Sequence, residues 1–187
     1  MMKLYGSFTS PFVRHCRIAL LQSGAEFEFI ETNYEQSATG SVAMRVPYLE
    51  HNGLTLNDSM SILRYVRERH DQIFCRNLAE YDLLLLINTA LDSTINLFLL
   101  ENSGIDIASN NYTQRQTARI QQCLEHLEQR ASDGLEWNDA GIRLACFIDW
   151  AQFRQRISFE RFPALQGWLE GASQSKEFQL TSPPCVG

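Results

Sequence analysis

The sequence predicts two domains, an α/β domain over residues 1–72 and an all-helical domain over residues 78–187. Short strand-like and helix-like segments alternate in the first part, whereas apolar residues recur at helical spacing throughout the second. A length of 187 residues suits one large domain or two small ones. Because the hydrophobic period changes near residue 70, we expect two.

The composition is that of an acidic globular chain. Lys and Arg number 16 against 22 Asp and Glu, for a net charge of −6. Nucleic-acid-binding proteins and polybasic membrane-surface proteins carry the opposite balance, so we expect neither nucleic acid nor a membrane as a partner. The apolar stretch 83–100 includes Asn88, Asp92 and Asn96, which favours a buried helix over a membrane span.

The cysteines indicate a reducing compartment. They are odd in number, and their spacing contains no Cys-x-x-Cys pair. The N-terminus shows no apolar signal region. We therefore expect a cytoplasmic protein with free thiols. The five positions are Cys16, Cys75, Cys123, Cys146 and Cys185.

The first domain opens as strand, helix, strand. Residues 3–6 form a short strand candidate, and residues 11–23 carry an apolar face at helical spacing. Ser10 is a suitable N-cap for this helix, Pro11 fits its first turn, and Gly24 ends it. Residues 27–30 alternate apolar and acidic side chains, as a second strand does.

A hairpin and a helix complete the first domain. The polar stretch 31–45 has room for one short helix at most. Residues 46–50 and 54–56 then flank Asn52-Gly53, a strong hairpin signal, and we expect His51 to be solvated in that turn. A helix follows from about Asp58. The order β-α-β then β-β-α predicts a small mixed sheet.

The second domain reads as helices joined by short loops. Asn138 is a suitable N-cap for the third of them, and Trp137 and Ile142 stand at the positions of a hydrophobic staple. The predicted helices span residues 83–100, 113–131, 139–156 and 163–171.

The clearest candidate for chemistry is Ser10, which stands where a strand ends and a helix begins. Free N–H groups and the positive end of the helix dipole favour an anion there. With no adjacent base, the hydroxyl is a poor nucleophile but can donate a hydrogen bond to a thiolate and so lower the pKa of the thiol. Plain N-capping is the alternative.

Two further candidates lie on either side of the hairpin. A cis Val46-Pro47 bond would turn the backbone of Val46 outward, where an extended peptide-like ligand can pair with it. Asp58 and Ser59 can hold the ammonium and carboxylate of an amino-acid head group at the start of the next helix. Capping is again the alternative. Cys16 reads as a core thiol, and the scattered histidines suggest no metal site.

The three candidates occur in a characteristic order. Ser10-Pro11-Phe12-Val13-Arg14 in the first βα turn, Val46-Pro47 before the hairpin, and Asp58-Ser59 at the next helix resemble the soluble glutathione S-transferase family, most closely its bacterial members with a serine in this turn. The chain is also similar to the tau, zeta and omega classes. Residues 162–169 resemble the family's late helix, so the resemblance covers nearly the whole chain.

The resemblance implies a thioredoxin-like N-terminal domain joined to an all-α domain, as a homodimer. It also implies a glutathione transferase without a metal, in which glutathione is co-substrate and a small hydrophobic electrophile lies between the domains. Ser10 would stabilise the thiolate, and Val46, before a cis Pro47, would pair with the cysteinyl backbone. Asp58 and Ser59 would hold the γ-glutamyl end, and Arg45 would meet the glycyl carboxylate.

The sequence departs from the family pattern at two places. Residues 32–45 are fewer than the family uses for its second helix and carry no basic ligand residue before Arg45, and Gly141 replaces a helix-capping acid. A regulatory or interaction protein with a degraded glutathione site is therefore the alternative to the enzyme. A third hypothesis, an oxidoreductase acting through Cys16, is disfavoured because Cys16 lies well inside its helix, away from the N-terminal dipole.

Overall fold

A computed structural model describes residues 1–184 as two compact units. Unit 1 contains residues 1–74 together with the segment that begins at Ser173, and unit 2 contains residues 75–172. The expected helical domain over 78–187 therefore ends earlier than its predicted boundary. Its last residues belong to unit 1 because they pack on the first helix of that unit. Cys185 lies outside the described residues.

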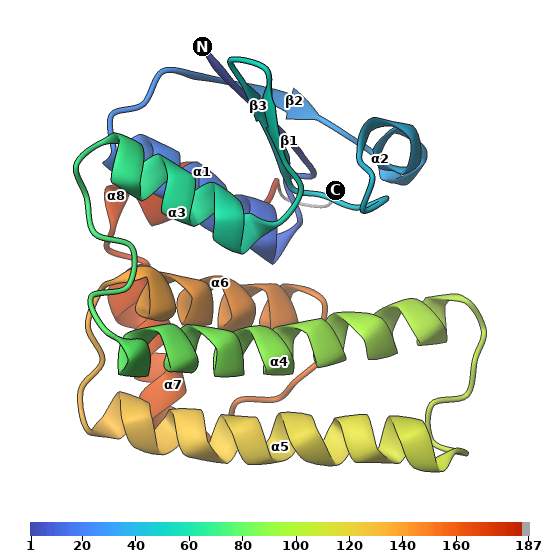
Figure 1. The fold of residues 1–187 in the computed structure, drawn as a ribbon. Helices are drawn as coiled ribbons and strands as arrows, with labels where there is room; N and C mark the ends of the chain where they lie inside the picture. Colours follow the sequence, from blue (N-terminus) through green and yellow to red (C-terminus); the bar gives the residue numbers. More distant parts are fainter. Residues whose placement is uncertain (185–187) are drawn as a thin grey trace. The chain divides into compact units, whose positions relative to one another are not determined.

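Unit 1 has the predicted mixed sheet (Figure 1). The strand order is β2-β1-β3-β4, with β1 parallel to β2 and antiparallel to β3. Its elements are β1 (Met2–Gly6), α1 (Pro11–Gln22), β2 (Phe27–Glu31), α2 (Tyr34–Gly40), β3 (Tyr48–His51), β4 (Leu54–Leu56), α3 (Ser59–Arg69) and α8 (Lys176–Leu180). The thioredoxin-like arrangement expected for this part of the chain is confirmed.

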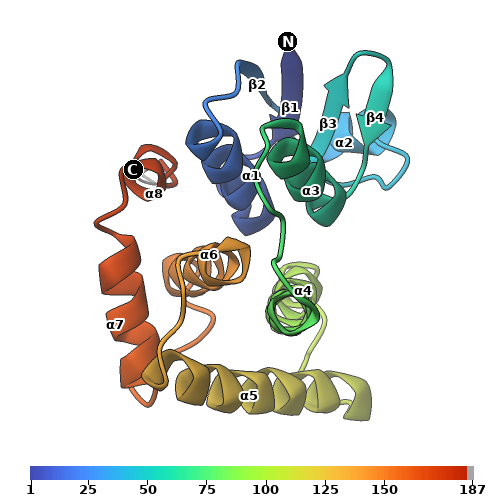
Figure 2. The ribbon, with the colours of Figure 1, turned by 60° about the vertical axis from the view of Figure 1, so that its left-hand side comes forward.

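The two faces of the sheet differ in chemistry because side chains alternate along each strand. Leu4 and Leu49 pair across β1 and β3 and are fully buried in the core formed with α1 and α3, which lie side by side in both views (Figures 1 and 2). On the other face Tyr5 stacks on Tyr48 at 4.3 Å and donates a 2.8 Å hydrogen bond to Glu50. Burial, reinforced by Glu50, raises the pKa of Tyr5 to about 12.

The hairpin turn forms where it was predicted, but His51 is not solvated. Asn52 and Gly53 have φ values of 50° and 79°, the positive pair that a two-residue hairpin turn requires. His51 at the end of β3 is buried, and its Nδ1 lies 2.7 Å from the hydroxyl of Tyr65 on α3. The partner lies 14 residues along the chain, so the local turn signal did not reveal the burial.

Unit 2 contains the remaining helices. Its elements are α4 (Leu78–Asn102), α5 (Asn111–Ser132), α6 (Asp139–Phe153) and α7 (Pro163–Ala172). Helix α4 packs on α5 and α6, and α7 packs on α5 and α6 in turn. By length and hydropathy alone, α4 is the one helix within residues 1–184 that could cross a membrane, a test that core helices also pass. Its inward residues Leu84, Ile87 and Leu91 are fully buried.

A close contact explains why Gly141 occupies the first turn of α6. Asn138 caps the helix as predicted, accepting a 3.1 Å hydrogen bond from the Gly141 N–H. A Cβ added at Gly141 would lie 2.8 Å from Cζ2 of Trp168, and the indole of Trp168 donates a 3.1 Å hydrogen bond to the Gly141 carbonyl. The glycine therefore leaves room for the backbone carbonyl of Glu136 as well as for α7 at the start of α6.

Candidate functional site

Ser10 lies at the N-cap of α1, as the sequence predicted. Its backbone is extended, and its hydroxyl oxygen accepts a 3.4 Å hydrogen bond from the N–H of Val13. Capping and function are compatible here, since the cap uses only a lone pair of the oxygen. The hydroxyl proton remains able to bond an anion above the helix N-terminus.

The turn before Ser10 is built by hydroxyl groups. Ser7 Oγ lies 3.1 Å from Thr9 Oγ1 and accepts a 3.3 Å hydrogen bond from the Thr9 N–H. The Ser10 N–H donates to the Ser7 carbonyl at 3.1 Å. These local bonds give the turn between β1 and α1 a defined backbone, and the Ser10 side chain that follows it is half-buried.

Val46 and Pro47 directly precede β3. The bond between them is cis, as the family resemblance implied. Pro47 is buried, while Val46 is half-buried. An extended residue at the entrance to a strand can offer its backbone groups to a ligand.

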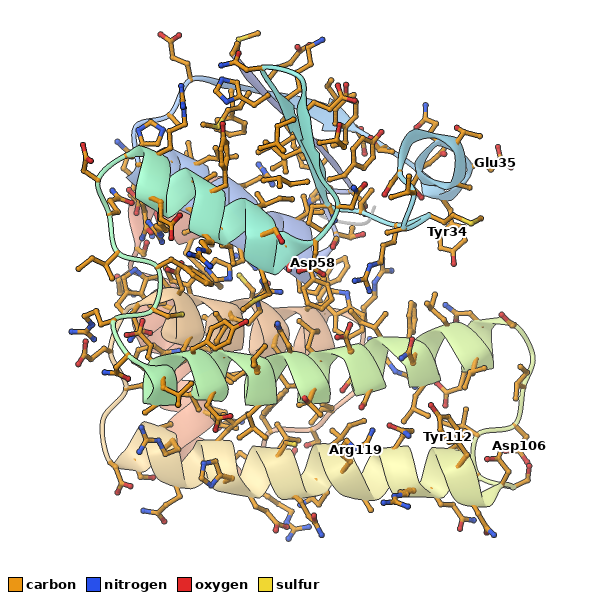
Figure 3. All side chains as sticks on the ribbon, viewed as in Figure 1. Tyr34, Glu35, Asp58, Asp106, Tyr112 and Arg119 are labelled. Carbon is orange, nitrogen blue, oxygen red and sulfur yellow. The ribbon has the colours of Figure 1, made fainter. Side chains whose placement is uncertain are left out.

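Asp58 is the N-cap of α3, and Ser59 is the first residue of that helix (Figure 3). Asp58 Oδ1 accepts a 2.8 Å hydrogen bond from the Met60 N–H. Its other oxygen, Oδ2, lies 3.0 Å from Nη2 of Arg45. Ser59 is buried, and its carbonyl lies 4.0 Å from the thiol of Cys16. Asp58 is therefore a cap that also presents a carboxylate oxygen to cations.

The register of the sheet brings these candidates to one edge. Tyr5 near the end of β1 pairs with Tyr48 at the start of β3, so the turn before Ser10 adjoins Val46-Pro47. Leu49 pairs with Leu56 at the end of β4, so the chain leaves β4 at that same edge and enters α3. All three candidate segments lie where those strands meet the loops to the helices.

The stretch between β2 and β3 contains one short helix, within the predicted limit. Asn33 and Gln36 form a capping box at the start of α2. Ser41 Oγ lies 3.1 Å from Oδ1 of Asn57, a contact that ties this stretch to the start of α3. Sequence reasoning missed this link, although the Asn57-Asp58-Ser59 run was a signal that several polar side chains meet there. Residues 32–44 contain no Lys, Arg or His, so Arg45 is the basic residue of this stretch.

The cysteines and histidines show no reactive cluster in the described part of the chain. Cys16 is fully buried, in agreement with its interpretation as a core thiol. Burial, followed by the charges of Glu80 and Asp139, raises the pKa of Cys75 to about 12. Across residues 1–184, no three His, Cys, Asp or Glu side chains come together in a group that could hold a metal ion.

Comparison with known proteins points to one family. Residues 4–73 match the family model described as glutathione S-transferase, N-terminal domain. The Escherichia coli K12 protein described as uncharacterized GST-like protein YibF is 29% identical, over 98% of this chain and 99% of its own. Glutathione S-transferase U6 of Arabidopsis thaliana is 34% identical over 38% of this chain. That match spans 35% of the plant protein, about a third of its length.

Solved structures share the fold across the whole chain. A glutathione S-transferase of Methylobacillus flagellatus, solved with glutathione bound, has a TM-score of 0.86 at 17% identity and covers 98% of this chain and 100% of its own. A glutathione transferase family member of Pseudomonas fluorescens, also with bound glutathione, has a TM-score of 0.83 at 20% identity over 99% and 100%. Residues 4–73 therefore match a glutathione S-transferase N-terminal domain, and the chain has the fold of the glutathione transferases.

Proposed function

We propose that the chain is a glutathione transferase that stabilises the thiolate of bound glutathione with Ser10. The observation that carries the proposal is the meeting of three segments at one sheet edge: the Ser10 turn, Val46 before the cis Pro47, and the α3 N-terminus with Asp58 and Ser59. Each offers a group that one part of the tripeptide needs. Relatives and solved neighbours bearing the transferase name support this choice.

The chemistry assigned to Ser10 is hydrogen-bond donation. Its oxygen accepts from Val13, so its proton is free to bond the sulfur of glutathione. The dipole of α1 and the hydroxyl both favour the anionic form, which lowers the pKa of the thiol from about 8.5. The thiolate then attacks an electrophilic carbon of a small hydrophobic substrate. A C–S bond forms, and the electron pair of the broken bond leaves with the displaced group.

The other candidates would bind the rest of the tripeptide. The Val46 backbone would pair with the cysteinyl residue. The γ-glutamyl ammonium would bond the Asp58 carboxylate, and its carboxylate would take the α3 N-terminus and the Ser59 hydroxyl. Arg45 would then turn from Asp58 toward the glycyl carboxylate. No metal is required by this chemistry.

We also propose that the protein is a cytoplasmic homodimer. Leu78, Leu85 and Leu99 are exposed on α4, and exposed apolar side chains on one helix are a feature that a subunit interface would cover. The four described cysteines are free thiols, which suits a reducing compartment. Sedimentation velocity of the wild-type protein and of a Leu85→Glu variant tests the dimer. A monomeric wild type would contradict it.

Titration of reduced glutathione into the protein tests the glutathione site directly. We expect micromolar to millimolar binding, with an ultraviolet difference signal from the bound thiolate. Ser10→Ala should still bind but lose the thiolate signal at neutral pH, since only the stabilising donor is removed. Turnover with a panel of aryl halides and epoxides should fall about a hundredfold or more in this variant.

A matched control is Ser132→Ala on α5. This serine is exposed and donates only to the Glu128 carbonyl of its own helix, at 3.1 Å. It should leave binding, thiolate signal and turnover at wild-type values. Wild-type thiolate formation in Ser10→Ala would show that another group stabilises the sulfur.

The second candidate is a binding or regulatory protein with a degraded glutathione site. The specific observations in its favour are the Arg45–Asp58 ion pair, which occupies a ligand group, and the absence of Lys, Arg and His from residues 32–44. Exposed Val42 and Met44 in the same stretch offer an apolar contact surface. No heat of binding and no thiolate in the wild type would favour this candidate over the enzyme.

A further inference from the structure

Arg14 connects the beginning of α1 with a segment more than 160 residues further along the chain. Its Nη2 donates to the Phe178 carbonyl at 3.0 Å and to Ser182 Oγ at 3.4 Å, and its Nε donates to Thr181 Oγ1 at 3.4 Å. The guanidinium also lies over the Phe178 ring, 3.7 Å from its centroid. We refer to these four residues as the Arg14 clasp.

Three of the four clasp residues are buried. Arg14 is 3% exposed, Phe178 is 3% exposed and Thr181 is fully buried. Removing a guanidinium from water is costly unless its N–H groups find acceptors, so the contacts from Arg14 must be kept in the folded protein. The acceptors are carbonyl and hydroxyl oxygens at the end of α8, where backbone carbonyls lack partners within the helix. Arg17 adds a 3.4 Å bond to the Thr181 carbonyl.

The backbone of Arg14 is bonded directly to the candidate catalytic residue. Its N–H donates a 2.9 Å hydrogen bond to the Ser10 carbonyl, the first helical bond of α1. The side-chain cap from Val13 to Ser10 is long, at 3.4 Å, and holds the hydroxyl only weakly. Val13 is wedged against Gly6, where an added Cβ would lie 2.5 Å from Cγ1 of Val13. The first turn of α1 is therefore fixed by β1 through Val13 and by α8 through Arg14.

We propose that Arg14 is a positioning residue for Ser10, and that the segment 178–182 holds the first turn of α1 in place through the Arg14 clasp. The inference rests on the proposed function only in assigning the thiolate to Ser10. A small displacement of a group that acts on a reacting atom lowers activity strongly, so a clasp distant in sequence can set the strength of the Ser10 hydrogen bond. Segment 178–182 thus has a role in the site without touching the ligand.

Two variants test the clasp from its two sides. Arg14→Met removes the donors from α1, while Thr181→Val removes one acceptor from the distant segment and leaves every charge unchanged. Arg64→Met on α3 is the control, because that guanidinium is exposed and pairs with Glu68. The pKa of glutathione bound to each protein is read from thiolate absorbance against pH. Amide hydrogen exchange of the peptide covering residues 7–14 is measured on the ligand-free proteins.

We expect Arg14→Met to raise the pKa of the bound thiol by about half a unit or more and to speed exchange in residues 7–14. Thr181→Val should act in the same direction with a smaller effect, and Arg64→Met should match the wild type. Arg14→Met could raise the thiol pKa while Thr181→Val changes neither the thiol pKa nor the exchange in residues 7–14. The positive charge of Arg14 would then affect the thiol without the clasp, and the inference would be wrong.

The two readings separate this inference from the proposed function. A wild-type protein that forms no thiolate contradicts the role of Ser10 in glutathione chemistry. Exchange in residues 7–14 then decides on the clasp alone: faster exchange in both clasp variants supports it, and wild-type exchange in both overturns it. Thr181→Val, which differs from the wild type by one hydroxyl, keeps the test valid if Arg14→Met does not fold.

Discussion

Arg45 and Asp58 form an ion pair, with 3.0 Å between Nη2 and Oδ2, while the second oxygen of the same carboxylate caps α3. Their side chains are 60% and 46% exposed. An ion pair this accessible contributes at most about 1 kcal/mol to stability. Breaking this ion pair therefore costs little free energy. A ligand ammonium can replace the Arg45 guanidinium at the Asp58 carboxylate.

Asp58→Ser separates the two uses of this residue. Serine is also a good N-cap, so the free energy of unfolding should stay within about 0.5 kcal/mol of the wild type. The carboxylate is lost, and a hydrogen bond from a charged ammonium is worth about 1.5–3 kcal/mol, so glutathione affinity should fall about tenfold or more. Urea unfolding and calorimetric titration measure the two effects. Unchanged affinity would remove Asp58 from the proposed site.

Gly6→Ala should disturb the start of α1. The new Cβ would lie 2.5 Å from Cγ1 of Val13, which is fully buried and cannot move aside. Overpacking of this kind costs about 1–3 kcal/mol, measurable by urea unfolding. Val13→Ala makes room for the new methyl group. The double variant should therefore lose less stability than the sum of the losses in the two single variants. Simple additivity would mean that the two side chains do not meet.

Glu128→Gln should weaken the start of α7. Glu128 on α5 accepts hydrogen bonds from the Ala164 and Leu165 N–H groups at 2.8 and 2.9 Å, one with each carboxylate oxygen. A neutral amide loses one acceptor and the favourable charge at the helix N-terminus, for about 0.5–2 kcal/mol of unfolding free energy. Glu125→Gln, on the exposed side of α5, is the control and should change stability by less than about 0.5 kcal/mol.

His51 should make folding sensitive to acid. Burial lowers its pKa, and the positive charges of Arg69 and the N-terminus lower it further. The unfolded chain, with a histidine pKa of about 6.5, then binds the proton more readily than the folded protein. The resulting stability is fully present above about pH 6.5 and is lost as the pH falls through the lower folded value.

The measurement is urea unfolding of wild type and His51→Gln at about pH 7.5 and about pH 5.5. The wild type should lose more stability over this interval than the variant. His126→Gln, at an exposed position on α5, serves as the control and should keep the wild-type pH dependence. Equal losses in all three proteins would assign the acid sensitivity to other groups.

Structural features that a short local sequence pattern specifies could be predicted from the sequence. The N-caps Ser10, Asp58 and Asn138 each precede an apolar helical period, and Asn52-Gly53 marks its hairpin without reference to the rest of the chain. The three segments of the candidate site could be identified because each lies at the beginning of a helix or strand. Their meeting at one sheet edge follows from strand register, which the order of elements largely determines.

Features that depend on distant partners were not predictable. Helix α8 has only five residues, too few to show a period, and it is held by Arg14 from the far end of the sequence. The burial of His51 depends on Tyr65, and the position of Arg45 depends on Asp58. In each case the deciding contact joins side chains whose approach is set by packing, which a local pattern does not encode.

The segment that begins at Ser173 belongs to the unit that contains Met1, so unit 1 is discontinuous in the chain. During synthesis all of unit 2 leaves the ribosome before Phe178 and Thr181 do. Until then the buried guanidinium of Arg14 lacks these acceptors. The sheet and α1 can form before unit 2 is synthesised, whereas the clasp joins residues 164 positions apart, a non-local contact of the kind that slows folding. A nascent chain therefore acquires the Arg14 clasp only after unit 2 has been synthesised.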